Sequence, residues 1–190
     1  MAAKDAWAFY CAHAAGENMN VTLVLGGARS GKSRYAESLC AKPRVYVATA
    51  QAFDAEMSAR IAKHQQQRGP AWTTVDAPID LLGALKAHDK AGQWVLVDCL
   101  TLWLTNLVMA EKDCEIEISA LVAMLANAHG NLVFVSNELG LGLVPETPLG
   151  RRFRDLHGIM NQRVAAACDT VVLLVAGLPL ALKGRLPSPR

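Results

Sequence analysis

The feature that most constrains the fold of this chain is a glycine-rich segment at residues 26–33, which reads Gly-Gly-Ala-Arg-Ser-Gly-Lys-Ser. It matches the phosphate-binding pattern G-x-x-x-x-G-K-S at every defined position. The segment follows the apolar run 21–25, which favours a strand, and opens onto residues 32–40, which favour a helix. A glycine-rich turn could match this pattern by chance. The strand before it and the helix after it favour a nucleoside triphosphate site instead.

Each residue type in this segment has a physical reason to surround a triphosphate. The glycines at 26 and 31 let the chain curl so that backbone N–H groups point inward, and the following helix presents its positive end to the same anion. Lys32 can reach the outer phosphates as a catalytic point charge, and the Ser33 hydroxyl is placed to bind Mg²⁺. The predicted nucleotide-binding residues here are Gly26, Gly27, Ala28, Arg29, Ser30, Gly31, Lys32 and Ser33.

The rest of the chain alternates between strand and helix patterns. Apolar runs with strand character lie at 44–49, 72–75, 93–97, 131–136 and 170–175, the last being the final clear strand. Helical patterns lie between them at about 54–67, 79–88, 100–110, 115–128 and 148–167, with Thr147 as the cap of the last. This alternation predicts an α/β fold of the P-loop NTPase type, with a mostly parallel sheet covered by helices on both faces.

Length and composition set the domain organisation. A chain of 190 residues with 52% hydrophobic residues is long enough for one well-packed domain, which we place at 21–183. Residues 1–20 are expected to be an amphipathic or disordered extension, and residues 184–190 a proline-rich tail.

The same features exclude several function classes. A net charge of +2 does not favour nucleic acid as a partner, and no apolar run approaches the ~20 residues that span a membrane. The five cysteines are scattered without metal-ligand spacing, which favours reduced thiols in the cytoplasm.

Residues that follow parallel strands are candidates for ligand contact, because ligands bind beyond the carboxyl ends of such strands. Asp98 ends an apolar run as a magnesium-binding acid would, although a strand-end acid could instead cap the next helix. Thr49, Ala50 and Gln51 end an earlier strand. The acids that follow at 54 and 56 are interpreted as caps of the next helix.

Two further segments carry candidate chemistry. Arg60, His64 and Arg68 stand at i, i+4 and i+8, which aligns them on one helix face. Neighbouring cations would keep the imidazole neutral and nucleophilic, but periodicity alone favours a solvated basic face. The second segment, 136–142, is a polar glycine-rich turn at a strand end. It is followed by the polar residues Arg151, Arg152, Arg154, Asn161, Gln162 and Arg163. Most of these are interpreted as the exposed side of an amphipathic helix, and one or two could reach an acidic substrate.

Several of these segments together resemble one enzyme family. They are GGARSGKS at 26–33, ATAQ at 48–51, EMSARIAKH at 56–64, RGPAW at 68–72, VDCLTLWLTN at 97–106, SNELGLGLVPE at 136–146, FRD at 153–155 and the pair Asn161-Gln162. In this order they resemble the bifunctional adenosylcobinamide kinase and adenosylcobinamide-phosphate guanylyltransferase family of cobalamin biosynthesis, from about 21 to 183.

The resemblance implies two successive reactions. ATP or GTP phosphorylates the aminopropanol hydroxyl of adenosylcobinamide, and GTP then guanylylates that phosphate through a GMP-histidine intermediate, releasing pyrophosphate. By its position in the R-I-x-x-H segment, His64 corresponds to the catalytic histidine. Relatives often carry two adjacent histidines, whereas Lys63 precedes His64 here and leaves one candidate.

The resemblance also implies further nucleotide contacts and an oligomer. The corresponding nucleotide-binding positions are Thr49, Ala50, Gln51, Gln65, Gln66, Gln67, Arg68, Asp76 and Asp98. Asp76 would recognise the guanine edge, but it could equally cap the helix that begins near residue 78. Magnesium would be held by Ser33 and Asp98, and a homotrimer is expected. Two other functions remain open, a different small-molecule P-loop kinase and a nucleotide-dependent binding module without transfer.

Overall fold

The computed structural model describes residues 20–52 and 69–189. No helix in these two ranges is both long enough and apolar enough to cross a bilayer. Along the chain the strands and helices are β1 (Val21–Gly26), α2 (Lys32–Leu39), β2 (Arg44–Ala48), the 3-10 helix η1 (Gly69–Ala71), β3 (Thr73–Asp76), α4 (Leu81–His88), β4 (Trp94–Asp98), α5 (Leu100–Met109), α6 (Cys114–Leu125), β5 (Asn131–Asn137), α7 (Pro148–Ala167), β6 (Thr170–Val175) and β7 (Leu178–Lys183).

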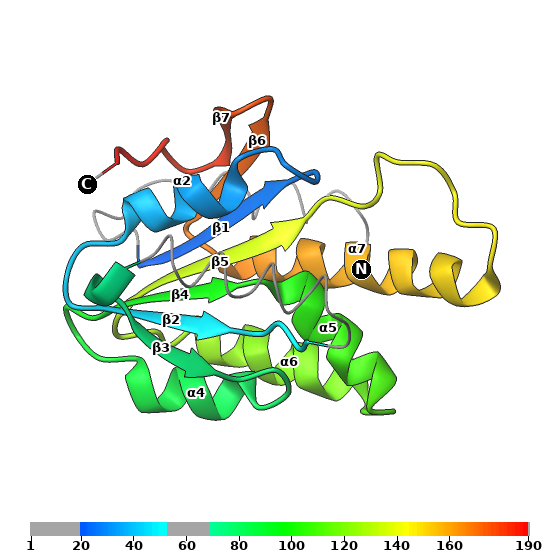
Figure 1. The fold of residues 1–190 in the computed structure, drawn as a ribbon, viewed down its shortest axis with the longest axis horizontal. Helices are drawn as coiled ribbons and strands as arrows, with labels where there is room; N and C mark the ends of the chain where they lie inside the picture. Colours follow the sequence, from blue (N-terminus) through cyan, green and yellow to red (C-terminus); the bar gives the residue numbers. More distant parts are fainter. Residues whose placement is uncertain (1–19, 53–68, 190) are drawn as a thin grey trace, which may run out of the picture.

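The strands of the described residues form one seven-stranded sheet in the order β3-β2-β4-β5-β1-β6-β7 (Figure 1). All neighbouring pairs are parallel except β6 and β7, which form an antiparallel hairpin at the edge. Strand β5 lies between β1, which leads into the phosphate-binding segment, and β4, which ends in Asp98. The predicted mostly parallel α/β sheet is therefore confirmed.

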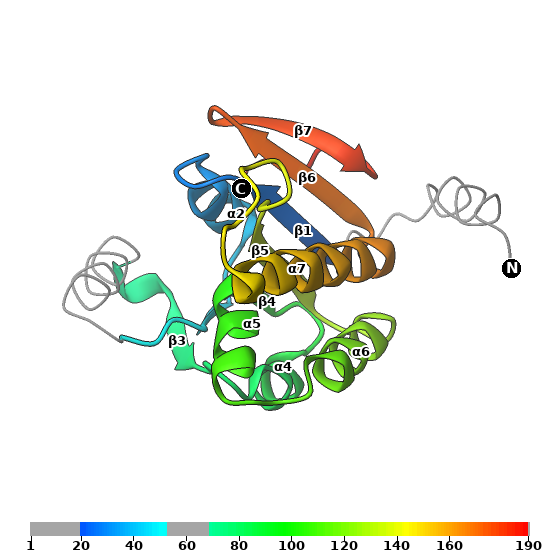
Figure 2. The same ribbon diagram turned by 90° about the vertical axis from the view of Figure 1, so that its right-hand side faces the viewer.

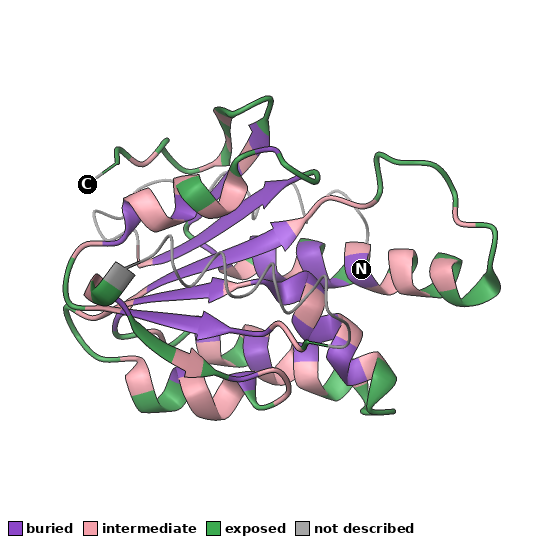
Figure 3. Ribbon diagram, viewed as in Figure 1, coloured by how far each residue is buried: buried purple, intermediate pink, exposed green. Residues whose placement is uncertain are grey.

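Helices cover both faces of the sheet, as predicted. One face packs against α2 through a cluster that includes Ala36 and Leu39. The opposite face packs against α4, α5, α6 and α7 (Figures 1 and 2) through a larger cluster that includes the fully buried Trp103 and Phe134. The central strands are buried along most of their length (Figure 3), so the two apolar layers fix the sheet between the helices.

Strand β7 was not expected from the sequence. Its Pro179 cannot donate a ladder hydrogen bond, which disfavours a strand assignment. The structure accommodates the proline because β7 is the last strand of the sheet, paired on one side with β6. The connection between the two strands places Ala176 and Gly177 at positive φ values of 52° and 81°, which is typical of a tight two-residue hairpin.

Candidate active site

The phosphate-binding segment adopts a tight turn between β1 and α2. Gly31 lies at φ 95°, a backbone conformation that is sterically strained for any residue with a Cβ atom. Arg29 also lies at a positive φ, 57°. Gly26 is needed for space rather than for φ, because a Cβ atom there would lie 2.9 Å from the Leu174 carbonyl oxygen. The turn thus brings successive backbone N–H groups to the N-terminus of α2, a geometry suited to binding anions.

The β6–β7 hairpin braces this turn. The Gly177 N–H donates a hydrogen bond to the Ser30 carbonyl oxygen at 3.0 Å, while the Ser30 N–H reaches the Gly27 carbonyl oxygen at 3.3 Å. The Ser30 side chain is buried, and its Oγ has no hydrogen-bond partner among the described residues. The hairpin that sequence patterns missed therefore supports the phosphate-binding segment directly.

Lys32 and Ser33 begin helix α2, where the sequence placed them. The Lys32 Nζ donates to the Gly27 carbonyl oxygen at 3.3 Å, so the ammonium group lies over the turn. Both residues are partly accessible, and Gly27, Ala28 and Arg29 are exposed. These groups can meet a polyphosphate from solvent without any rearrangement of the core.

Asp98 lies at the carboxyl end of β4, two strands from the phosphate-binding segment. Its Oδ2 accepts a hydrogen bond from the Tyr46 hydroxyl at 3.1 Å. The alternative reading, in which Asp98 caps the next helix, is wrong, because the N-cap of α5 is Cys99 and that cap has no side-chain hydrogen bond. Burial raises the pKa of the Cys99 thiol to about 11, so this cysteine is not a nucleophile at neutral pH.

Thr49 is fully buried and holds the end of β4 in place. Its Oγ1 accepts from the Cys99 N–H and donates to the Cys99 carbonyl oxygen, both at 2.8 Å, and its own carbonyl accepts from the Asn106 Nδ2 at 2.7 Å. The Thr49 hydroxyl is thus engaged within the protein. In the predicted segment 49–51, the partly accessible residues are Ala50 and Gln51.

Asp76 ends the edge strand β3 and is exposed. It does not cap the next helix, because the N-cap of α4 is Asp80, whose carboxylate accepts from the Gly83 N–H at 2.8 Å. The sequence reading placed that helix start a few residues too early. Asp76 is therefore available for a ligand, and the capping alternative is wrong.

The remaining predicted site residues lie in 53–68, outside the described residues. They are the nucleophile candidate His64, its neighbour Arg60, and Gln65, Gln66, Gln67 and Arg68. The described residues on either side of this segment are Ala52, which follows β2, and Gly69, which begins η1.

Comparison with known proteins decides the family. The profile of the family described as cobinamide kinase / cobinamide phosphate guanyltransferase matches residues 22–182. The chain is 47% identical over 167 residues to the bifunctional adenosylcobalamin biosynthesis protein CobP of Pseudomonas aeruginosa, covering 85% of this chain and 96% of that protein. The chain belongs to this family.

Two further relatives support the same family assignment. The CobU proteins of Salmonella typhimurium and Escherichia coli, both named bifunctional adenosylcobalamin biosynthesis proteins, are 40% and 39% identical over 178 residues. Each alignment covers 85% of this chain and 98% of the relative. The family resemblance inferred from the ordered motifs is thus confirmed.

In this family member, a buried polar network lies next to the phosphate-binding turn, and sequence reasoning missed it. His157 of α7 is 1% exposed, and its Nε2 lies 3.0 Å from the Thr101 Oγ1. Thr101 Oγ1 also accepts from the Asn137 N–H at 2.9 Å, so it links the His157 ring to the end of β5. Burial lowers the pKa of His157 to about 4. The network therefore contains a neutral histidine at ordinary pH.

A second branch of the network starts from the same helix. The Ser136 Oγ donates to the Asn161 Oδ1 at 2.7 Å, and the Asn161 Nδ2 donates to the Asn137 carbonyl oxygen at 3.0 Å. The signal in the sequence is the i, i+4 spacing of His157 and Asn161 on the otherwise apolar face of α7. Such a pair of polar residues at core positions indicates a specific hydrogen-bonded partner.

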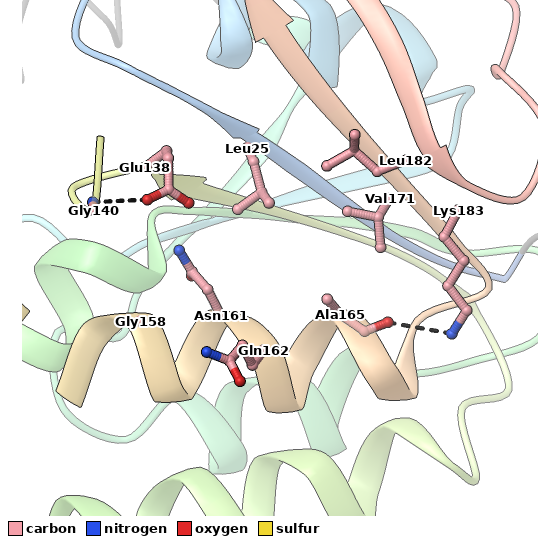
Figure 4. Close-up of a pocket in the computed structure, with 10 residues that line it drawn as sticks. All are labelled: Leu25, Glu138, Gly140, Gly158, Asn161, Gln162, Ala165, Val171, Leu182 and Lys183. Carbon is pink, nitrogen blue, oxygen red and sulfur yellow. Dashed lines mark hydrogen bonds between the residues drawn. The ribbon is translucent and has the colours of Figure 1, made fainter. Parts of the chain in front are cut away.

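A cavity of about 340 Å³ lies between the sheet and α7 (Figure 4). Leu25, Val171 and Leu182 form its apolar side, Glu138 lies at one end, and Lys183 lies at the other. Lys183 Nζ donates to the carbonyl oxygens of the last turn of α7, and Glu138 accepts from the Gly140 N–H at 2.7 Å. Both charged groups at its ends are thus already engaged with backbone groups.

The arginines after the glycine-rich turn stabilise the turn itself. Arg154 Nη2 donates to the Gly140 carbonyl oxygen at 2.9 Å, and Arg151 Nη1 donates to the carbonyls of Pro145 and Glu146. Arg152 is exposed. That one or two polar side chains of this region reach a substrate stays a prediction.

Proposed function

We propose that this chain catalyses both reactions of its family, phosphorylation of adenosylcobinamide and guanylylation of the resulting phosphate. The observation that supports the proposal is an anion-binding turn with Lys32 and Ser33 at the start of α2 and Asp98 at the carboxyl end of β4, in a chain 47% identical to a bifunctional relative. The substrates are then ATP or GTP together with adenosylcobinamide and its phosphate. A kinase limited to the first reaction would need the turn but not His64.

In the kinase step, the chain acts by positioning and by electrostatic stabilisation. The backbone N–H groups of the turn and the N-terminus of α2 hold the phosphates, and Lys32 lies where negative charge builds up on the transferred group. The terminal phosphoryl group moves to the hydroxyl oxygen of the aminopropanol arm. The hydroxyl loses its proton, and the nucleoside diphosphate leaves.

The donor groups at this edge of the sheet fit a magnesium ion. Ser33 supplies a hydroxyl and Asp98 a carboxylate, both partly accessible, and Mg²⁺ needs few protein ligands when phosphates complete its coordination. When bound, Mg²⁺ would neutralise charge on the phosphate oxygens. The Tyr46 hydroxyl orients the carboxylate that would receive it.

In the guanylyl transfer, we assign the nucleophile to His64. Its ring nitrogen attacks the α-phosphorus of GTP and pyrophosphate leaves, which forms a GMP-histidine bond. A phosphate oxygen of adenosylcobinamide phosphate then attacks the same phosphorus and releases the histidine. Gln65, Gln66, Gln67 and Arg68 would contact the nucleotide, and Asp76, exposed at the end of β3, would accept hydrogen bonds from the guanine N–H groups.

We also propose that the chain is a cytoplasmic homotrimer. The family resemblance supports the trimer. The exposed leucines Leu178, Leu180 and Leu182 on one face of β7 support an oligomer, because an apolar edge face is usually covered by another surface. The free cysteines among the described residues, such as the buried Cys40 and Cys168, support a reducing compartment. Sedimentation equilibrium tests the trimer, and a monomer would exclude it.

The transferase assignment is tested with GTP labelled at the α-phosphate. We expect an acid-labile, alkali-stable adduct on the protein that is lost in His64→Ala. His129→Ala is the matched control, because His129 is exposed and pairs with Asp89 at the far end of β5. An intact protein that forms no adduct, or an adduct that survives in His64→Ala, would overturn the assignment.

A further inference from the structure

Asn137 occupies the place in the sheet between the phosphate-binding turn and Asp98. It is the last residue of β5, which separates β1 from β4. In the parallel register, Asn137 lies opposite Gly26, the first residue of the phosphate-binding segment, and Asp98 lies opposite Val135. The carboxyl ends of these three strands therefore bring the turn, an amide and an acid to one edge of the sheet.

The side chain of Asn137 points to the face of the sheet that packs against α2, the helix that follows the phosphate-binding turn. Side chains alternate along a strand, and the preceding Ser136 reaches Asn161 on the α7 face. Asn137 therefore projects to the opposite face, where α2 packs and where Tyr46 contacts Asp98. It is half-buried, and no group in the described part of the chain forms a hydrogen bond with its side-chain amide.

The backbone around this residue is held by side chains from two helices. Its N–H donates to the Thr101 Oγ1 at 2.9 Å, and its carbonyl oxygen accepts from the Asn161 Nδ2 at 3.0 Å. The next N–H, that of Glu138, donates to the Gly26 carbonyl oxygen at 3.1 Å. The Thr101 hydroxyl is itself held by a hydrogen bond with His157 Nε2 at 3.0 Å. A strand end that only terminates a sheet does not need hydrogen bonds from helices to both of its peptide groups. A residue whose side chain must meet a ligand within a few tenths of an ångström does need its backbone fixed in this way.

We propose that Asn137 donates a hydrogen bond from its side-chain amide to the terminal phosphoryl group of the bound triphosphate. The inference rests on the kinase step proposed above and adds a residue that touches the transferred group. A neutral amide can donate to the phosphoryl oxygens from the side opposite Lys32 without adding charge to the site. A diphosphate lacks this group, so Asn137 would distinguish the donor from the spent nucleotide.

The test compares the affinities of two nucleotides in the presence of Mg²⁺. Calorimetry with a β,γ-imido ATP analogue and with ADP is carried out on the wild type, on Asn137→Ala and on the isosteric Asn137→Asp. We expect the analogue to bind about 10- to 100-fold more weakly to both variants, with ADP affinity changed less than about twofold in Asn137→Ala. Kinase kcat should fall by about 100-fold or more in the same variants.

The matched control is Asn131→Ala, at the opposite end of the same strand, which should leave both affinities unchanged. An equal loss of analogue and ADP binding in Asn137→Ala, or no loss of either, would overturn the inference and leave Asn137 as a structural strand end. The binding measurement needs no cobinamide. It therefore decides the role of Asn137 even if the wild type fails to phosphorylate adenosylcobinamide, a result that would refute the proposed function instead.

Discussion

His157 should make the folded protein sensitive to mild acid. In the folded chain, burial lowers its pKa to about 4, whereas an unfolded histidine has a pKa near 6.5. Between these two values the unfolded chain binds a proton that the folded chain does not. The contribution of this residue is therefore fully present above pH 6.5 and is lost as the pH falls towards 4.

The size of the effect follows from the two pKa values. Linkage gives a loss of about 2 kcal/mol of unfolding free energy at pH 5 and about 3 kcal/mol at pH 4, relative to pH 7.5. The variant His157→Gln keeps a polar side chain that does not titrate, so it lacks this pH-dependent loss of unfolding free energy. At pH 7.5 it should be less stable than the wild type by about 1–3 kcal/mol, because the contact with Thr101 is disturbed.

Urea unfolding of the wild type and His157→Gln between pH 7.5 and 4 measures the difference. We expect the stability gap to narrow as the pH falls and to vanish or reverse near pH 4.5, because other titrating groups cancel between the two proteins. His129→Gln is the control, since that side chain is 74% exposed and lies outside the buried network of His157. A gap between the wild type and His157→Gln that stays constant from pH 7.5 to 4 would refute the buried neutral histidine.

Two further predictions concern the nucleotide site. Lys32→Ala should lower kinase kcat by about 100-fold or more with the fold intact, whereas Lys86→Ala on the exposed side of α4 should not; equal activity of Lys32→Ala and wild type would exclude the assigned loop chemistry. Asp76 and Asp80, which lie at the end of β3 and at the start of α4, should have different mutational effects. Asp80→Ala should lower the unfolding free energy by about 1 kcal/mol without changing the preference for GTP over ATP. Asp76→Ala should lower the preference for GTP over ATP and leave the unfolding free energy unchanged. A loss of stability without a loss of GTP preference would contradict the assignment of Asp76 to guanine recognition.

The elements that the sequence predicted well are those with strong local signals. The phosphate-binding turn is encoded by adjacent residues, so its glycines and Lys32 could be placed from spacing alone. The buried strands are continuous apolar runs, and helix α7 has both a Pro at its start and a capping Thr147 that accepts from the Gly150 N–H. These features depend on neighbours in sequence.

What the sequence did not predict depends on contacts between distant segments. Strand β7 exists because β6 offers an edge that tolerates Pro179, and the local pattern contains no sign of that edge. The hydrogen bonds of Asn137 come from Thr101 and Asn161, on helices α5 and α7. The choice between Asp76 and Asp80 as the cap depends on where α4 begins, a boundary that propensity locates only to within a few residues.

In the proposed function, one chain performs two transfers on the same acceptor. A direct test incubates the protein with adenosylcobinamide, with ATP and GTP that both carry one label at the γ-phosphate, and with a second label at the α-phosphate of the GTP, and then isolates the cobinamide product. We expect one product that carries both labels in equal amounts, and pyrophosphate released with it. A product that carries only the γ-label would contradict the account and reduce the chain to a kinase.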